Sequence, residues 1–258
     1  MKLLPVLVLA QFAALYPLFL WIAPLRQLPA GFTRFNLGMA TVILGLATLL
    51  AAAGGLPWPM LRLLLLLAVT TLVLQRLLWE KPLRARSLLT PIQLVWGLTL
   101  WQPILATTSL TSPLTVWISI ALGGLAFGGV MYAMVLGHWY LNVVDLPVRF
   151  LQLACRAALG ILVVRLVWSL GILAFSEAVV HQRMKPAYVL LGELDGIFLW
   201  LGLAPGLIGG MVVTFMALKS ALIQSTQSAT GLLYVALVLV AMSTLSFSGY
   251  LVLKDMPL

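Results

Sequence analysis

Charged side chains are scarce in this sequence. Only 8% of its 258 residues are charged and 63% are hydrophobic, whereas a soluble domain is usually about 25% charged and about 45–50% apolar. A chain of this composition cannot hide its apolar surface from water, so a soluble fold is excluded. The sequence therefore predicts an integral membrane protein.

Residues that commonly carry catalysis or bind metals are few. The chain has one cysteine, Cys155, and two histidines, His138 and His181. A single cysteine excludes an internal disulfide, and no grouping of His, Cys and carboxylates has the spacing of a metal site. Phosphate-loop, nucleophile-elbow and HExxH patterns are missing from the sequence. We therefore expect no metal site and no catalysis by this chain on its own.

Basic residues outnumber acidic residues by 15 to 6. In a soluble protein this excess would suggest nucleic acid, but here most basic residues fall between apolar runs. Lys and Arg in such places hold loops on the cytoplasmic side and contact anionic lipid headgroups. The lipid bilayer, and not nucleic acid, is the partner that this charge predicts.

Eight apolar runs have roughly the 20 residues that a membrane-spanning helix needs. They cover residues 3–25, 36–56, 60–79, 88–108, 113–142, 150–175, 187–218 and 230–253. Their uniform apolarity excludes barrel strands, in which apolar and polar residues alternate. The expected fold is all-α, a polytopic transmembrane bundle of about eight helices forming one integral membrane domain over residues 1–258. One run contains Gln93, Gln102 and Pro103, and a re-entrant segment is the alternative there.

The Lys and Arg residues in the loops and at the ends of the runs predict the orientation. One side of the membrane holds Arg26, Arg34, Arg76, Lys81, Arg84, Arg86, Arg149 and Lys219, and the other holds Lys2, Arg62, Arg183, Lys185 and Lys254. The first side is more basic and is densest in LQRLLWEKPLRAR. We expect it to be cytoplasmic. The prediction is a multi-pass protein of the cell inner (cytoplasmic) membrane with both termini on the non-cytoplasmic side.

Charged residues inside the predicted spans are candidates for structure or function. Arg165 lies near the middle of the sixth run, and Glu193 and Asp195 lie in the seventh. At 1.5 Å per residue, the acids are roughly 10 Å and Arg165 roughly 15 Å from the same side of the membrane. Unpaired charge is unfavourable at such depth. We expect Arg165 to pair with Glu193 or Asp195, and a proton or ion path using Glu193 is the functional alternative.

The seventh run also carries small residues at four-residue spacing. Gly202 and Gly206 follow this spacing, with Pro205 between them. Small residues four apart let two helices approach closely, and proline removes a helical hydrogen bond. We expect close packing and a kinked or loosened helix here.

Two neutral polar clusters, GHWYLN (137–142) and QSTQS (224–228), interrupt the apolar pattern. Successive spans run in opposite directions, so counting the spans (helix parity) puts both clusters at the same end of the bundle. A quinone headgroup or a haem edge could bind there. The candidate residues are His138, Trp139, Tyr140, Asn142, Gln224, Ser225 and Gln227. Interface anchoring by the aromatic residues and capping of the last helix by QSTQS are the plainer alternatives. His181 falls on the opposite side, so a haem could take only a single ligand, His138.

The blocks GHWYLN and STQSATGLLY resemble signatures of uncharacterised prokaryotic multi-span membrane proteins. The resemblance implies no activity, cofactor or catalytic residue, but it favours a role for His138, Asn142 and QSTQS beyond anchoring. We expect an integral membrane subunit of a larger electron-transfer complex, respiratory or photosynthetic, with other membrane subunits as partners. A small-solute transporter or proton channel that uses the intramembrane charges is one alternative. An intramembrane lipid-acting enzyme with His138 as its base is another.

Overall fold

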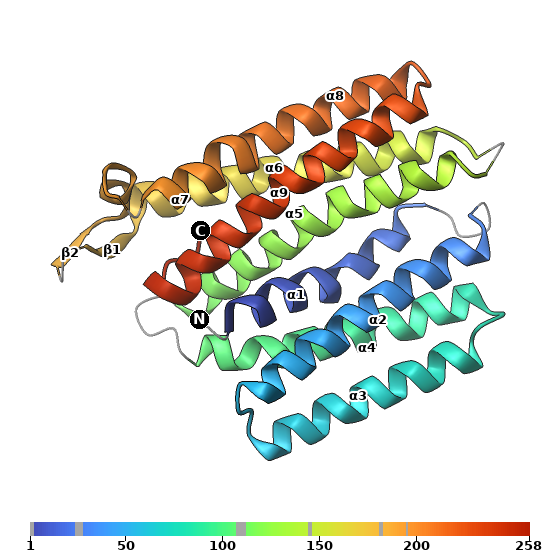
Figure 1. The fold of residues 1–258 in the computed structure, drawn as a ribbon, viewed down its shortest axis with the longest axis horizontal. Helices are drawn as coiled ribbons and strands as arrows, with labels where there is room; N and C mark the ends of the chain where they lie inside the picture. The colour runs from blue at the N-terminus through green and yellow to red at the C-terminus, as the bar shows by residue number, and fades with distance from the viewer. Residues whose placement is uncertain (1–2, 24–27, 107–111, 144–145, 181–182, 195) are drawn as a thin grey trace. The chain divides into compact units, whose positions relative to one another are not determined.

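The predicted all-α membrane architecture is confirmed. The computed structural model describes residues 3–23, 28–106, 112–143, 146–180, 183–194 and 196–258. Within these ranges, eight helical segments are long and apolar enough to cross a membrane. They group into two compact units, residues 1–106 and 107–258 (Figure 1). The single membrane domain expected from the sequence stays a prediction.

The described part of the first unit holds four of these spans. α1 (Leu3–Leu15) runs into the 3₁₀ turn η1 (Tyr16–Trp21), and α2 (Ala30–Ala53), α3 (Trp58–Leu77) and α4 (Pro82–Leu105) follow. α1 packs against α2 and α4, and α3 packs against the same two helices (Figure 1). The α2–α4 pair is therefore the centre of this unit.

The described part of the second unit holds the other four spans. Its elements are α5 (Pro113–Tyr140), α6 (Arg149–Phe175), β1 (Glu177–Val180), β2 (Arg183–Pro186), η3 (Ala187–Gly192), α7 (Gly196–Leu201), η4 (Gly202–Gly209), α8 (Gly210–Leu222) and α9 (Thr226–Lys254). α9 packs against α5 and α8, and α6 packs against the same two helices. The strands β1 and β2 form an antiparallel hairpin between the sixth and seventh spans.

Two helices begin at a proline, a position where this residue breaks no helical hydrogen bond. α4 begins at Pro82 and α5 at Pro113, positions where the backbone N–H has no helical partner to lose. The hydroxyl of Ser112 also accepts a hydrogen bond from the Thr115 amide, at 3.4 Å, and so caps α5. These residues begin the helices at the joins that the sequence predicted.

α4 is one continuous helix although Pro91 and Pro103 lie inside it. Its 24 residues give a length of about 36 Å, more than the ~30 Å hydrocarbon core. Gln93 is fully buried, and its amide donates to the Leu37 carbonyl at 2.9 Å and to Thr41 Oγ1 at 2.8 Å. This polar side chain thus joins α4 to α2, and the helix does not turn back as a re-entrant segment would.

The seventh span begins later than the apolar run suggested. The run predicted a helix over 187–218, whereas the span covers Gly196–Leu222 and follows the hairpin and η3. Glu193 therefore precedes the span, and its carbonyl accepts a hydrogen bond from the Gly196 amide at 2.9 Å. The predicted depth of Glu193 in the membrane is corrected accordingly. Asp195 lies outside the described residues.

The centre of the seventh span widens into the π turn η4, which contains Pro205. Gly202, Gly206 and Gly210 face α9, and a Cβ atom on any of them would lie 2.6–2.9 Å from an atom of that helix. Larger side chains would force the two helices apart. The close packing and the loosened helix predicted from Gly202, Pro205 and Gly206 are both confirmed.

Apolar side chains point outward as well as inward. On α3, Leu65, Leu66 and Leu72 are exposed, whereas Leu64 and Thr71 are fully buried. α3 therefore turns one narrow face to α2 and α4 and a broad leucine-rich face to its surroundings. Such a surface requires apolar surroundings, as a lipid bilayer provides.

Candidate functional site

His138 and Tyr234 meet at one end of the second unit. His138 lies in the last turn of α5 and Tyr234 in the third turn of α9. Tyr234 Oη lies 3.4 Å from His138 Nδ1, and both side chains are exposed. The tautomer of the imidazole decides which of the two groups donates. The structure thus brings GHWYLN and STQSATGLLY together, at the end of the bundle where helix parity put them.

A close helix contact holds this pair in place. Gly137 on α5 faces Thr230 on α9, and a Cβ atom at position 137 would lie 2.7 Å from the Thr230 hydroxyl oxygen. That hydroxyl donates to the Thr226 carbonyl at 2.7 Å. Thr230 and Tyr234 are four residues apart, so they share one face of α9. The missing side chain at Gly137 lets Tyr234 come within reach of the His138 ring.

The other polar residues of GHWYLN bond locally. The Tyr140 hydroxyl donates to the Pro147 carbonyl at 2.5 Å, and the Asn142 amide donates to the His138 carbonyl at 3.4 Å. The first bond holds the chain that follows α5, and the second satisfies a carbonyl at its end. Trp139 is half-buried. Tyr140 and Asn142 therefore fit the anchoring alternative, whereas the His138 ring reaches another helix.

QSTQS covers the end of the join between α8 and α9 and the first residues of α9. Gln224 takes a left-handed conformation with φ of 61° and is exposed, as is Gln227. Ser225 lies at the N-cap of α9 and makes no side-chain capping bond, although its carbonyl accepts from the Ala229 amide at 3.0 Å. Among the described contacts, none joins Gln224, Ser225 or Gln227 to the His138 ring. Gln224 and Ser225 lie in the join and Gln227 in the first turn of α9, and the described contacts bring none of the three to the His138–Tyr234 pair.

Tyr234 is the site residue that the sequence analysis left out. An aromatic residue near the end of a span reads as an interface anchor, so its type alone gave no signal. Its spacing could have found it. Tyr234 follows Thr230 by one helical turn, at the end of the block STQSATGLLY.

Arg165 is buried deep in the second unit, with 4% of its surface exposed. Its Nη1 donates to the Ser119 carbonyl at 2.6 Å and lies 3.3 Å from the Ser119 hydroxyl oxygen. Its guanidinium carbon lies 5.3 Å from the centre of the Phe247 ring. A carbonyl dipole, a hydroxyl and an aromatic face therefore surround the cation. Glu193 is not among its described partners, and a pair with Asp195 stays a prediction because Asp195 lies outside the described residues.

The residues after α9 fold back beside this arginine. Asp255 takes a left-handed conformation with φ of 54°, and Met256 and Leu258 are buried. The Ser119 hydroxyl donates to the Leu258 carbonyl, and the Trp168 indole donates to the Pro257 carbonyl at 3.2 Å. Protein atoms therefore occupy the space next to Ser119.

In the described part of the chain, no group of three His, Cys, Asp or Glu side chains could hold a metal ion. His181 lies outside that part. The exposed His138–Tyr234 pair is the candidate ligand site of the second unit. Comparison of the chain with protein-family models, curated proteins and solved structures found no match.

Proposed function

We propose that this chain is an integral membrane subunit of a larger electron-transfer assembly and that it binds a quinone headgroup at His138 and Tyr234. The observation that carries the proposal is the pairing of these two exposed side chains, with Oη and Nδ1 3.4 Å apart. One side chain comes from each of the two helices whose polar clusters interrupt an apolar sequence.

The pair offers the groups that a quinone headgroup needs. The carbonyl oxygens of a quinone accept hydrogen bonds, and an imidazole N–H and a phenol O–H both donate them. Reduction to the quinol takes two electrons and two protons. A redox subunit bound to this chain would supply the electrons. Water would supply the protons, and the imidazole of His138, which has one nitrogen that donates and one that accepts, would pass them to the quinone oxygen.

A haem edge is the second candidate for the same place. The contact between Nδ1 and Tyr234 orients the imidazole and leaves Nε2 as its metal-binding nitrogen. A single axial ligand of this kind would suit a haem held between this chain and a partner subunit. The quinone is the better match because the pair keeps one donor for a quinone carbonyl in either tautomer, the His138 Nε2–H or the Tyr234 O–H, whereas a haem needs the tautomer with Nε2 unprotonated.

The outer surface supports membership of an assembly. An exposed apolar helix face can pack against partner helices as well as against lipid. The broad leucine-rich face of α3 is exposed in this way. The distribution of Lys and Arg supports the cytoplasmic membrane, with the α3–α4 loop on the cytoplasmic side and both termini on the other.

A transport path receives less support from the described contacts. Such a path would use Arg165, Glu193 and Asp195 together. The Arg165 cation contacts Ser119 and Phe247, and Glu193 precedes the seventh span. No described observation gathers these charges along one route.

Purification from the native host tests membership of an assembly. The full chain, tagged and extracted in mild detergent, should co-purify with stoichiometric cytochrome or iron–sulfur subunits identified by mass spectrometry. An organic extract of the same preparation should contain quinone. Recovery of the chain alone, free of quinone, would contradict both parts of the proposal.

Single variants test the site within that preparation. Tyr234→Phe and His138→Gln should each lower the quinone retained at least fivefold while the same subunits co-purify. Tyr188→Phe is the matched control, because Tyr188 is 55% exposed against 46% for Tyr234 and lies in η3 at the other end of the unit. Equal quinone in all three variants would rule out the site and leave the subunit proposal standing.

A further inference from the structure

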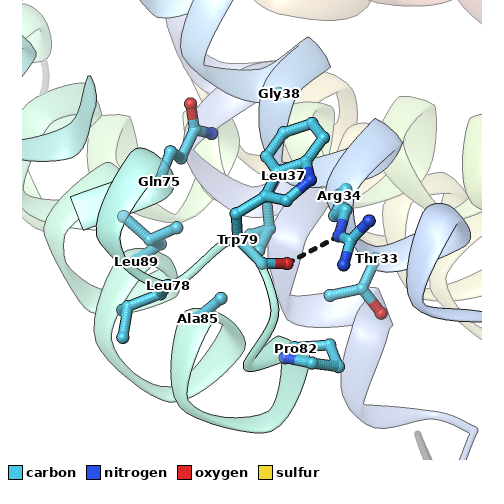
Figure 2. Close-up of a pocket in the computed structure, with 10 residues that line it drawn as sticks. All are labelled: Thr33, Arg34, Leu37, Gly38, Gln75, Leu78, Trp79, Pro82, Ala85 and Leu89. Atoms are coloured by element: carbon cyan, nitrogen blue, oxygen red, sulfur yellow. Dashed lines mark hydrogen bonds between the residues drawn. The ribbon is translucent and has the colours of Figure 1, made fainter. Parts of the chain in front are cut away.

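We propose that a pocket in the first unit binds the phosphate of an anionic phospholipid headgroup. The pocket lies where α2 begins, α3 ends and α4 begins (Figure 2). About 60 Å³ of it is open to the centres of water-sized groups. Since one such group needs about 10–15 Å³, the pocket has room for the four oxygens of one phosphate.

Arg34 is fixed in the orientation that this site needs. Its Nε donates to the Trp79 carbonyl at 2.6 Å, and its guanidinium carbon lies 4.7 Å from the centre of the Trp79 ring (Figure 2). In the described part of the chain, no protein acceptor is found for Nη1 or Nη2. The side chain is thus held by one nitrogen and offers two to a ligand, in the fork geometry that matches a phosphate.

Thr33 supplies a second donor. The residue lines the pocket next to Arg34 and is 1% exposed. Its hydroxyl has no hydrogen-bond partner among the described residues, and a buried hydroxyl in that condition is unfavourable by about 1–3 kcal/mol. Once the Thr33 side chain turns its hydroxyl toward the pocket, a phosphate oxygen held by Arg34 would accept a hydrogen bond from it as well.

The charge around the pocket favours an anion. Arg76, Lys81 and Arg84 are exposed on the end of α3 and the start of α4, and Glu80 is the acidic residue between them. The net positive charge would attract acidic headgroups to this part of the membrane surface. Gln75 also lines the pocket, but its amide donates to Thr41 Oγ1 at 2.7 Å.

A lipid fits better than free phosphate because the pocket continues into an apolar face. Gln75 lines the pocket from the last turn of α3 and Trp79 from the turn that follows it. Leu65, Val69 and Leu72 precede Gln75 on α3 at steps of three and four residues. These three side chains are exposed, and residues at such spacing share one face of a helix. A headgroup in the pocket could therefore lay its acyl chains along α3.

Native mass spectrometry of the full, delipidated chain in detergent tests this site with dioleoylphosphatidylglycerol as the probe. We expect one tightly retained lipid, an apparent Kd at least tenfold weaker in Arg34→Gln, and a Kd about threefold weaker in Thr33→Val. Arg62→Gln is the matched control. Like Arg34, Arg62 stacks on a tryptophan, Trp58 at 5.1 Å, but it lies at the opposite end of α3 from the pocket. The control should bind like the unmodified chain.

The other results would overturn the proposal. Equal loss in Arg34→Gln and Arg62→Gln would mean that the lipid binds by general charge. If inorganic phosphate displaces the lipid at equal concentration, the ligand is phosphate and not a lipid. Thr33→Val guards against a folding artefact, because it removes a hydroxyl without a described partner and keeps the side-chain shape. Unchanged affinity in this variant would overturn the assignment of the Thr33 hydroxyl as a donor to the lipid phosphate.

Discussion

The Gly137 backbone on α5 lies so close to Thr230 on α9 that a Cβ atom at position 137 would be 2.7 Å from the threonine hydroxyl oxygen. No flexible side-chain end is available to move away, because the hydroxyl is bonded within its own helix to the Thr226 carbonyl. The distance between α5 and α9 at the His138–Tyr234 pair is therefore set by the absence of one methyl group.

Gly137→Ala should lower the free energy of unfolding by about 1–3 kcal/mol, the usual effect of overpacking a well-filled interface. Thermal denaturation in detergent measures it. Gly231→Ala is the control, since Gly231 is a neighbour of Thr230 on α9 and a Cβ there would meet nothing within 4 Å. If the two variants melt at the same temperature, α5 and α9 are not in the contact described.

Arg165→Met should leave the melting temperature unchanged or raise it. The methionine is of similar length and avoids burying a cation. Among the described residues this cation contacts Ser119 and Phe247 and no carboxylate, so the change leaves no described acidic partner behind. Arg156→Met, on the exposed face of the same helix, should change stability by less than about 0.5 kcal/mol. A loss of several kcal/mol in Arg165→Met would instead indicate that a carboxylate outside the described contacts pairs with Arg165.

Gln93→Ala should destabilise the first unit by about 2–4 kcal/mol. The change removes two hydrogen bonds to α2 and leaves a cavity where a fully buried side chain stood. Gln102→Ala removes the same amide from an exposed position of α4 and should be neutral. Denaturation of both proteins in one detergent makes the comparison, and similar midpoints would contradict the buried position of Gln93.

Gly206→Ala should weaken the packing of the seventh span on α9, because its Cβ would lie 2.9 Å from the backbone nitrogen of Ser243. A backbone atom cannot move aside without moving its helix. Gly209→Ala should be tolerated, because its nearest neighbours would be 3.6 Å away. Melting temperatures in a common detergent separate the two, and a larger loss in Gly209→Ala would argue against this helix pairing.

Long apolar runs predicted the number of spans and the start of α5 at residue 113, but not where α2 begins. The second run was read from residue 36 and the helix begins at Ala30, because Thr33 and Arg34 look like loop residues although both are helical. Asn36 is buried there and accepts a hydrogen bond from the Tyr16 hydroxyl. Hydropathy cannot anticipate a polar residue whose partner comes from another helix.

The candidate site was predicted in part for a similar reason. Helix parity put GHWYLN and STQSATGLLY at the same end, and that relation depends only on counting spans. The described partners of Arg165 could not be found by searching for acidic residues, because they are a backbone carbonyl, a hydroxyl and an aromatic ring. Such partners have no signature in the sequence.

The π turn in the seventh span has an angular consequence. In an ordinary α-helix, residues four apart are offset by about 40° at each step, so Gly202 and Gly210 would differ in direction by about 80°. A turn bonded from i to i+5 is wider, which brings a four-residue step closer to one full rotation and keeps Gly202, Gly206 and Gly210 aimed at α9. Deleting one residue within η4 would rotate the glycine row away from α9 and put bulkier side chains in its place.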